Sequence, residues 1–235
     1  MLKKNDFVEI DFIGRIKGSG IFDTTKKETA KEAGIDDSKC QPMKICVGQR
    51  MLIKGFDDAL EGKELGKEYK IELLPKDAFG ERDSSLLKTV PLRMFTEKGI
   101  SPQQGMIYSF DNALARISSV TGGRVTIDFN NPLAGKNIVY DFTVNRLIED
   151  MKEKVSIVIG LFLPFPNPEI RINGKNATLV LPQKLPEQIF ELIKNKVKEL
   201  LDVELSLEVK EIKEKSGKAD EIKKENKKID EHNKE

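Results

Sequence analysis

Short runs with strand periodicity dominate the first 150 residues, and one short amphipathic helix lies among them. In VEIDFIGRI, the residues Val8, Ile10 and Phe12 fall on one face of a predicted strand. Further strands are predicted at MKICVG, LGKEYKIELL and KNIVYDFTVNRLIE, and the helix in MLIKGFDDALEG, which Gly62 closes. Short strands of antiparallel character around a single helix predict an α+β fold.

Residues 85–129 have a different sequence pattern from the segments on either side. A short helix is predicted around Pro91–Lys98, followed by strands at GMIYSF, LARISSV and GRVTIDF. Asp111–Asn112 and Gly122–Gly123 have the composition of hairpin turns. We therefore predict a small β-rich insert instead of a loop.

A third module, also of α+β type, is predicted over residues 155–212. VSIVIGLFLPF is predicted as a buried strand, PEIRINGKNATLVL as a hairpin around Asn173–Gly174, and VELSLEVKEI as a closing strand. A helix over residues 186–201 places one apolar face inward, with Ile189, Phe190, Ile193, Val197 and Leu200 on that face. Residues 213–235 are mostly Lys and Glu and predict a solvated helix or a disordered tail.

The scarce residue types exclude several functions. Histidine occurs once, at His232, and cysteine twice, at Cys40 and Cys46, which excludes Ser-His-Asp and Cys-His catalysis and a four-ligand zinc site. Lys+Arg 40 against Asp+Glu 39 leaves a net charge of +1, which argues against a nucleic-acid partner. No apolar run approaches the roughly 18 residues of a membrane span, and the first residues turn polar too early for a secretory signal. We expect a cytoplasmic protein without metal or cofactor.

Five segments together resemble the FKBP-type peptidyl-prolyl cis-trans isomerases: IDFIG (10–14), IFDTT (21–25), VGQRMLIKGFDDALEGKELGK (47–67), DAFGE (77–81) and IVYDFTV (138–144). The insert between DAFGERD and NNPLAGK resembles the SlyD-like, insert-in-flap branch, and the C-terminal extension resembles long archaeal members. The resemblance implies a half-barrel, an antiparallel sheet wrapped over one helix. It covers roughly residues 1–150 and implies an isomerase domain (1–84 plus 130–150) and an insert-in-flap chaperone domain (85–129). The sequence pattern adds a C-terminal α+β domain (155–212) and a charged tail (213–235).

Carried over position by position, the resemblance implies a catalytic pocket lined by eight residues: Phe12, Phe22, Asp23, Leu52, Ile53, Phe56, Phe79 and Tyr140. Phe56 stands where the family usually has Trp, which keeps an aromatic floor. Phe79 stands where the family has a Tyr whose hydroxyl binds a carbonyl, so that this hydroxyl is missing. Asp23 has an alternative interpretation as a turn or cap residue, and Tyr140 as a plain core residue.

Such a pocket suits prolyl isomerisation, because rotation about an X-Pro bond needs no covalent step. An apolar pocket strips water from the amide and thereby favours its twisted, less polar form. The Ile53 backbone N–H is the expected anchor for a substrate carbonyl, with Asp23 as the charge that orients it. Catalysis without His, Cys or metal is therefore chemically reasonable.

A module of about 45 residues buries its apolar groups poorly, so part of the insert's apolar surface is expected to be exposed. The SlyD-like resemblance implies that the insert binds unfolded, proline-containing polypeptides through this surface. The candidate binding residues are Met94, Phe95, Ile107, Tyr108, Phe110, Leu114 and Ile117. The alternative is that these residues form the insert's own core. A competing function, favoured by Phe79, is a non-catalytic holdase with a decayed pocket. The apolar residues at 161–165 need cover, either from helix 186–201 or from a second copy of the chain in a homodimer.

Overall fold

The computed structural model describes residues 1–38, 40–110, 113–163 and 168–210. The chain separates into two compact units, Met1–Glu149 and Asp150–Glu235, and each is described by itself. The predicted Asp111–Asn112 turn, Phe165 and the charged tail with His232 lie outside the described residues. No helix in the described ranges is both long and apolar enough to cross a membrane.

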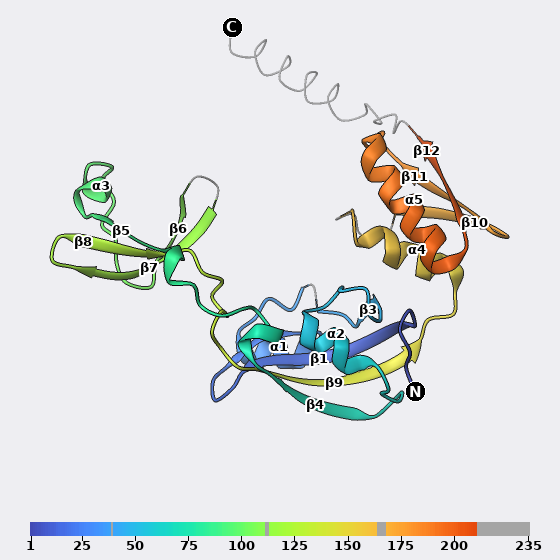
Figure 1. The fold of residues 1–235 in the computed structure, drawn as a ribbon, viewed down its shortest axis with the longest axis horizontal. Coiled ribbons are helices and arrows are strands. Elements are labelled where there is room, and N and C mark those ends of the chain that lie inside the picture. Colours follow the sequence, from blue (N-terminus) through green and yellow to red (C-terminus); the bar gives the residue numbers. More distant parts are fainter. Residues whose placement is uncertain (39, 111–112, 164–167, 211–235) are drawn as a thin grey trace, which may run out of the picture. The chain divides into compact units, whose positions relative to one another are not determined.

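The main sheet of the first unit is antiparallel throughout (Figure 1). Its order is β2-β1-β9-β4, and β3 pairs with the opposite end of β1 from β2. The strands are β1 (Phe7–Ile16), β2 (Ile21–Thr24), β3 (Met43–Cys46), β4 (Glu68–Leu73) and β9 (Ile138–Leu147). The two long central strands, β1 and β9, come from opposite ends of this unit's sequence.

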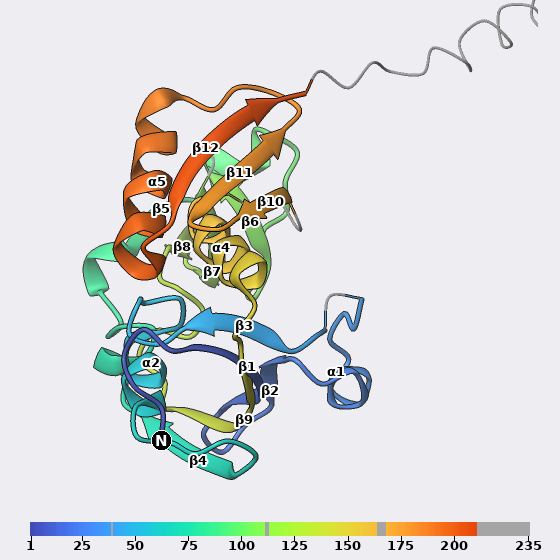
Figure 2. The same cartoon turned by 90° about the vertical axis from the view of Figure 1, so that its right-hand side faces the viewer.

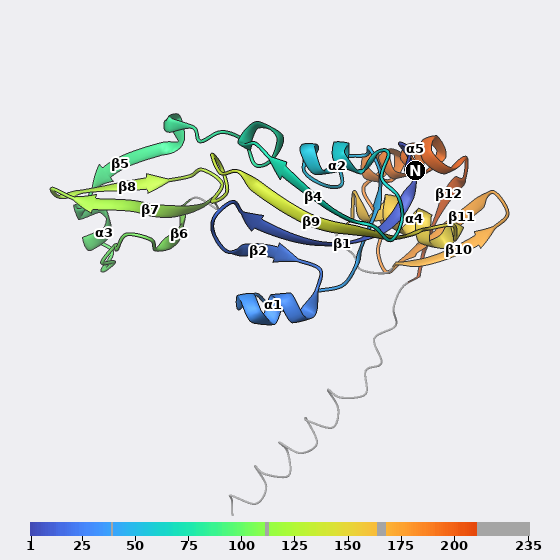
Figure 3. The ribbon, with the colours of Figure 1, turned by 90° about the horizontal axis from the view of Figure 1, so that it is seen from below.

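Helix α2 (Lys54–Leu60) packs against one face of this sheet, whereas α1 (Lys27–Ala33) lies beyond the β2 edge (Figure 3). Phe56 and Leu60 of α2 are buried in the core that β1 and β9 contribute, together with Val8, Ile10 and Val144. A short 3-10 turn, η1 (Pro75–Asp77), follows β4. The arrangement confirms the predicted α+β half-barrel.

Residues 84–128 form a second sheet of order β5-β8-β7-β6. Its elements are η2 (Ser84–Leu86), β5 (Leu87–Pro91), α3 (Arg93–Thr96), β6 (Ile107–Phe110), β7 (Ala113–Thr121) and β8 (Arg124–Asp128). Gly122 and Gly123 form the β7–β8 turn with φ values of 57° and 72°, which glycine adopts without strain. Strand β5 was not predicted, because LKTVP is short and ends in a proline that reads as a helix start.

The second unit has a three-stranded sheet of order β10-β11-β12 with two helices (Figure 2). Its elements are α4 (Met151–Gly160), β10 (Glu169–Asn173), β11 (Asn176–Leu181), α5 (Glu187–Leu201) and β12 (Glu204–Val209). Strands β10 and β11 form the predicted hairpin, and α5 is the crossover between the parallel pair β11 and β12. Helix α5 packs on β12, and α4 packs on α5 and β10.

The prediction of a strand at VSIVIGLFLPF was wrong, because its first part belongs to α4. A short apolar run does not distinguish a buried helix from a buried strand by periodicity. The deciding signal precedes the run: the side chain of Asp150 accepts a hydrogen bond from the Glu153 N–H at 2.7 Å and caps the helix. Val155, Val158 and Ile159 are then buried. Helix α4 packs against α5, whereas the cover of the apolar residues at 161–165, by helix 186–201 or by a second copy of the chain, stays a prediction.

Candidate functional site

Five of the predicted pocket residues contribute their rings to one contiguous aromatic cluster between the main sheet and α2, which Phe142 and Tyr69 extend. The Phe56 ring stacks on the Tyr140 ring with centroids 4.5 Å apart, and the Phe12 ring meets both edge-on at 5.8 and 5.7 Å. The Phe22 ring continues the cluster, 6.0 Å from Tyr140 and 5.8 Å from Phe79. Five of the eight predicted pocket residues are thus in ring contact.

Burial divides the cluster into a floor and a rim. Phe12, Phe56 and Tyr140 are 6%, 1% and 4% exposed, which makes them a closed floor. The rim residues are only half-buried and pack against the same core: Phe22, Leu52, Ile53 and Phe79. Apolar surface therefore remains available above the floor.

Gly14 allows two of these rings to approach the sheet. It pairs with Asp23 on β2 and with Tyr140 on β9. A Cβ atom at Gly14 would lie 2.8 Å from Tyr140 Cε1 and 2.9 Å from Phe22 Cζ, closer than real Cβ contacts. We did not identify Gly14 as a site residue; the available signal was a glycine inside a strand pattern.

Two buried threonines hold β2 against β1 beside Phe12. The Thr25 hydroxyl accepts a hydrogen bond from the Phe12 N–H at 2.9 Å and donates to the Asp11 carboxylate at 2.7 Å. The Thr24 hydroxyl donates to the Phe12 carbonyl at 3.0 Å. Thr24 and Thr25 thus make structural hydrogen bonds, and Asp23, which precedes them, lies at the border of the aromatic cluster. The sequence did not predict this role of the two threonines.

Ile53 immediately precedes α2 and presents an N–H group. Its carbonyl accepts hydrogen bonds from the Phe56 and Asp57 N–H groups, each at 3.0 Å. Among the hydrogen bonds of the described residues, none uses the Ile53 N–H. Gly55 lies two residues after Ile53, where a Cβ atom would be 2.9 Å from the Asp77 carbonyl oxygen. Glycine at this position therefore lets α2 approach the loop that carries Phe79.

The fully buried carboxylate of Asp57 orders the loop before Leu52 and Ile53. Its two oxygens accept hydrogen bonds from the Gly48 N–H at 2.9 Å and the Arg50 N–H at 2.8 Å. Arg50 has a φ of 58°, which few residues adopt without such support. Asp57 is therefore a structural anchor of the site that the sequence did not reveal, because an aspartate on a short helix looks like a surface residue.

Two titratable groups at the cluster, Asp23 and Tyr140, have raised pKa values. Partial burial raises the pKa of the Asp23 carboxyl, and a hydrogen bond to the Thr24 backbone opposes the change. Burial, and secondarily the negative charge of Asp23, raise the pKa of the Tyr140 hydroxyl well above its ordinary value. Tyr140 consequently keeps its proton at every physiological pH and remains a hydrogen-bond donor.

The seven candidate residues of the insert divide into surface and core. Met94, Ile107 and Leu114 are 55%, 63% and 74% exposed. Tyr108 and Phe110 are half-buried against the insert's core. Phe95 and Ile117 lie within that core at 5% and 0% exposure, which supports the alternative interpretation for these two residues.

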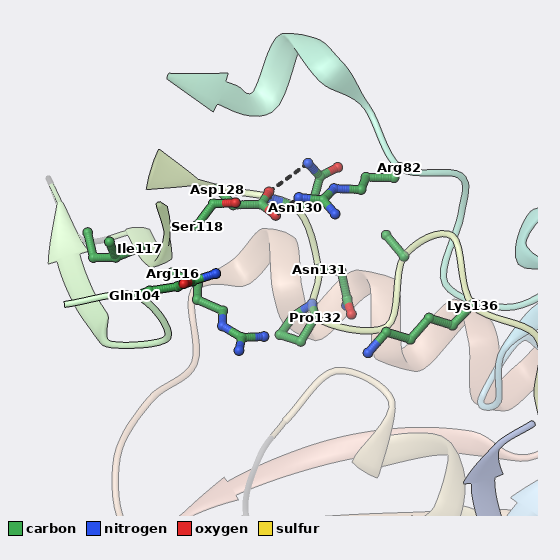
Figure 4. Close-up of a pocket in the computed structure, with 11 residues that line it drawn as sticks. Arg82, Gln104, Arg116, Ile117, Ser118, Asp128, Asn130, Asn131, Pro132 and Lys136 are labelled. Atoms are coloured by element: carbon green, nitrogen blue, oxygen red, sulfur yellow. Dashed lines mark hydrogen bonds and ion pairs between the residues drawn. The ribbon is translucent and has the colours of Figure 1, made fainter. Parts of the chain in front are cut away.

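A hollow of about 260 Å³ lies at the base of the insert, apart from the aromatic cluster (Figure 4). Its walls combine charged and polar side chains with Ile117, Pro132 and Ala134, and none of the eight predicted pocket residues lines it. The aromatic cluster, and not this hollow, has the apolar surface that amide rotation needs. In the described part of the chain, no three His, Cys, Asp or Glu residues group closely enough to hold a metal ion.

The sequence matches known proteins in two regions. The pattern of the FKBP-type peptidyl-prolyl cis-trans isomerase family matches residues 1–109, and that of the FKBP26 IF domain matches residues 88–133. A short-type peptidyl-prolyl cis-trans isomerase of Methanocaldococcus jannaschii is 36% identical over 146 residues, 61% of this chain and 92% of the relative. SlyD of Escherichia coli, an FKBP-type peptidyl-prolyl cis-trans isomerase, is 29% identical over 128 residues, 52% of this chain and 64% of the relative.

A probable FKBP-type 16 kDa peptidyl-prolyl cis-trans isomerase of Pseudomonas fluorescens is 31% identical over 108 residues, 44% of this chain and 71% of the relative. A half-barrel with an aromatic floor and these matches define the class as a prolyl isomerase. The chain belongs to the FKBP-type peptidyl-prolyl cis-trans isomerase family, with SlyD among its homologues.

Proposed function

We propose that this chain accelerates protein folding by isomerising X-Pro bonds in the aromatic cluster and by holding unfolded clients through the insert. The observation that carries the catalytic half is the Phe56–Tyr140 stack at 4.5 Å, closed below and open at the rim. Rotation about the bond meets a barrier of roughly 18–20 kcal/mol. The twisted amide has lost its conjugation, so apolar walls that exclude water favour it over the planar, hydrated form.

The eight pocket residues have distinct roles in this proposal. The apolar rings and the side chains of Leu52 and Ile53 exclude water, while the Ile53 N–H donates to a substrate carbonyl. Asp23, at the border of the cluster, orients the carbonyl that rotates. Phe79 lacks a hydroxyl, so the pocket offers its substrate one hydrogen bond fewer than a pocket with Tyr at this position.

The test is the cis-to-trans rate of an Xaa-Phe-Pro peptide, with the parent chain and with the double variant Asp23→Ala, Phe56→Ala. We expect acceleration by the parent and its loss in the variant. Phe56→Trp alone serves as a control that keeps an aromatic floor, and circular dichroism verifies that each variant is folded. Equal acceleration by parent and folded double variant would place catalysis elsewhere.

A holdase without isomerase activity is the second candidate, and Phe79 is the observation that favours it. This function predicts no acceleration of the peptide by the parent, together with suppressed aggregation of an unfolded protein. Phe79→Tyr distinguishes a weakened pocket from a lost one, because restoring the hydroxyl increases the rate only if the pocket still binds prolyl peptides.

The proposed client surface of the insert consists of Met94, Ile107 and Leu114, and Met106 of the same insert is 38% exposed. Exposed methionine and branched apolar side chains adapt to clients of varied sequence. Tethering by the insert raises the local concentration of prolines near the pocket. The clients are therefore unfolded or partly folded proline-containing chains.

Replacement of Met94, Ile107 and Leu114 by Ser, or deletion of residues 85–129, is expected to preserve turnover of short peptides. Refolding of a proline-limited protein should slow by about tenfold or more, because effective concentration is lost. Ser substitutions at Leu65, Leu147 and Val209, which are exposed outside the insert, provide the matched control. Unchanged refolding by the insert variants would contradict client capture.

We also propose that the second unit mediates homodimerisation. Leu192 of α5 is 58% exposed, and exposed apolar residues beside a small sheet favour self-association. Sedimentation of the full chain against a chain ending at Glu149 tests this, and a monomeric full chain would contradict it.

A further inference from the structure

The hollow at the base of the insert is built by the segments that connect the insert to the main sheet (Figure 4). Arg82 precedes the insert, whereas Asn130 and Lys136 follow it, and Arg116 belongs to β7. A client held by the insert while its proline occupies the aromatic cluster spans the same two sheets that these connecting segments join.

The hollow carries an excess of positive charge. Arg82 pairs with Asp128 at 2.5 Å, and the Asn130 side-chain amide donates to the other oxygen of Asp128 at 2.8 Å. The negative charge of Asp128 is thereby neutralised by residues that also line the hollow. The side chains of Arg116 and Lys136 form no ion pair or hydrogen bond with the described residues. Figure 4 shows their charged ends entering the hollow from opposite sides.

The remaining wall suits a piece of polypeptide. Gln104, Ser118 and Asn131 supply amide and hydroxyl groups that match a peptide backbone. The volume of about 260 Å³ lies below the roughly 300–1,000 Å³ of small-molecule sites. It therefore accommodates one or two side chains of a passing chain, and not a free cofactor.

We propose that this hollow is a subsite for a carboxylate of the client, the side chain of an Asp or Glu near the isomerised proline, held between Arg116 and Lys136. A single carboxylate offsets one of the two positive charges and can accept hydrogen bonds from both cations. The subsite rests on the proposed function, since it defines which clients the isomerase prefers: proline-containing segments with a nearby acidic residue.

The test uses the full chain and two series of fluorescent 15-residue peptides with one Phe-Pro bond. One series carries a single Asp at successive positions, and the other carries Asn at the same positions. At low salt, we expect Asp to strengthen binding by about fivefold at one or more positions, a typical size for two partly solvated ion pairs. The preference should shrink at 1 M salt.

The double variant Arg116→Gln, Lys136→Gln should lose the preference and leave the binding of the Asn peptides unchanged. The double variant Lys98→Gln, Arg124→Gln, which removes two exposed cations of the insert that do not line the hollow, should retain it.

Equal binding of both series to the parent, or an unchanged preference after Arg116 and Lys136 are replaced, would overturn the subsite. Isomerisation and Asn-peptide binding without an Asp preference would remove the subsite alone, whereas the failure of both series and of isomerisation would remove the proposed function as well. Stronger binding of a single-stranded oligonucleotide, dependent on the same two cations, would overturn the subsite in favour of a nucleic-acid surface.

Discussion

Gly14 provides the space in which the rings of Phe22 and Tyr140 meet. We expect Gly14→Ala to lower the free energy of unfolding by about 1–3 kcal/mol, because both rings must move to admit the methyl group. The kcat/KM for prolyl peptides should fall with it. Gly20→Ala is the matched control, since nothing lies within 4 Å of a Cβ atom there. Urea unfolding and the peptide assay measure both effects, and a Gly14→Ala variant as stable and active as Gly20→Ala would contradict the packing argument.

Asp23 gives a pH prediction. Its pKa is raised by partial burial, so the carboxylate takes up a proton at a higher pH than an exposed aspartate does. If the ionised form orients the substrate, kcat/KM falls as the pH falls through that raised pKa. Asp23→Asn should lower kcat/KM about tenfold at pH 7, or about 1.4 kcal/mol of transition-state stabilisation, and should remove this acidic limb.

Stability should respond to the same substitution with the opposite sign. A raised folded-state pKa means that the folded state favours the protonated acid, so ionised Asp23 weakens folding as the pH rises through that pKa. Asp23→Asn is therefore expected to leave the stability at pH 7 equal or slightly higher. A large loss of stability would show that Asp23 is a structural turn residue.

At the residue scale, the sequence predicted the side chains of the aromatic cluster but not the residues that hold them in place. Phe12, Phe56 and Tyr140 came from a family resemblance, and the structure brings their rings together. Gly14 and Thr25 act through contacts between segments that are distant in the sequence or meet only in the folded sheet. A glycine inside a strand pattern marks Gly14 as unusual, but no local pattern indicates which rings or strands the two residues contact. Their functional roles depend on what they hold in place.

At the scale of elements, Asp57 joins α2 to the loop that precedes it. Asp57→Ala should cost about 2–4 kcal/mol, because the Gly48 and Arg50 N–H groups lose their acceptor. Asp57→Asn keeps one carbonyl acceptor and should cost less. Asp58→Ala is the control on the same helix, since Asp58 is solvent-exposed and should matter little. Denaturant midpoints measure the loss of stability in each variant, which should be largest for Asp57→Ala, smaller for Asp57→Asn and smallest for Asp58→Ala. Equal losses for Asp57→Ala and Asp58→Ala would contradict this role of Asp57.

Elements with a clear period were predicted well, and the failures have a common cause. Strand β1 alternates and α5 repeats its apolar residues at helical spacing, so both could be found from the sequence. The run that became α4 is continuously apolar and has no period, and β5 is short. Tertiary packing and the Asp150 cap make the first segment the helix α4. Pairing with β8 makes LKTVP the strand β5.

At the scale of the whole molecule, the division after Glu149 predicts that the first unit folds without the second. A chain ending at Glu149 should keep at least half of the parent's kcat/KM for short peptides, because every proposed pocket residue precedes that point. Peptide kinetics and thermal unfolding test this expectation. An unfolded or inactive truncated chain would mean that residues 150–235 stabilise the catalytic sheet.

The pairing of β1 with β9 also determines an order of events during synthesis. β1 spans Phe7–Ile16, but its partner begins only at Ile138, and at about 5–20 residues per second a ribosome needs on the order of ten seconds to make the intervening chain. The sheet of the insert contains only nearby segments and can close earlier. Until β9 emerges, Val8, Ile10 and Phe12 are exposed apolar residues on a nascent chain. The first unfolded polypeptide that the insert meets is therefore its own N-terminal segment.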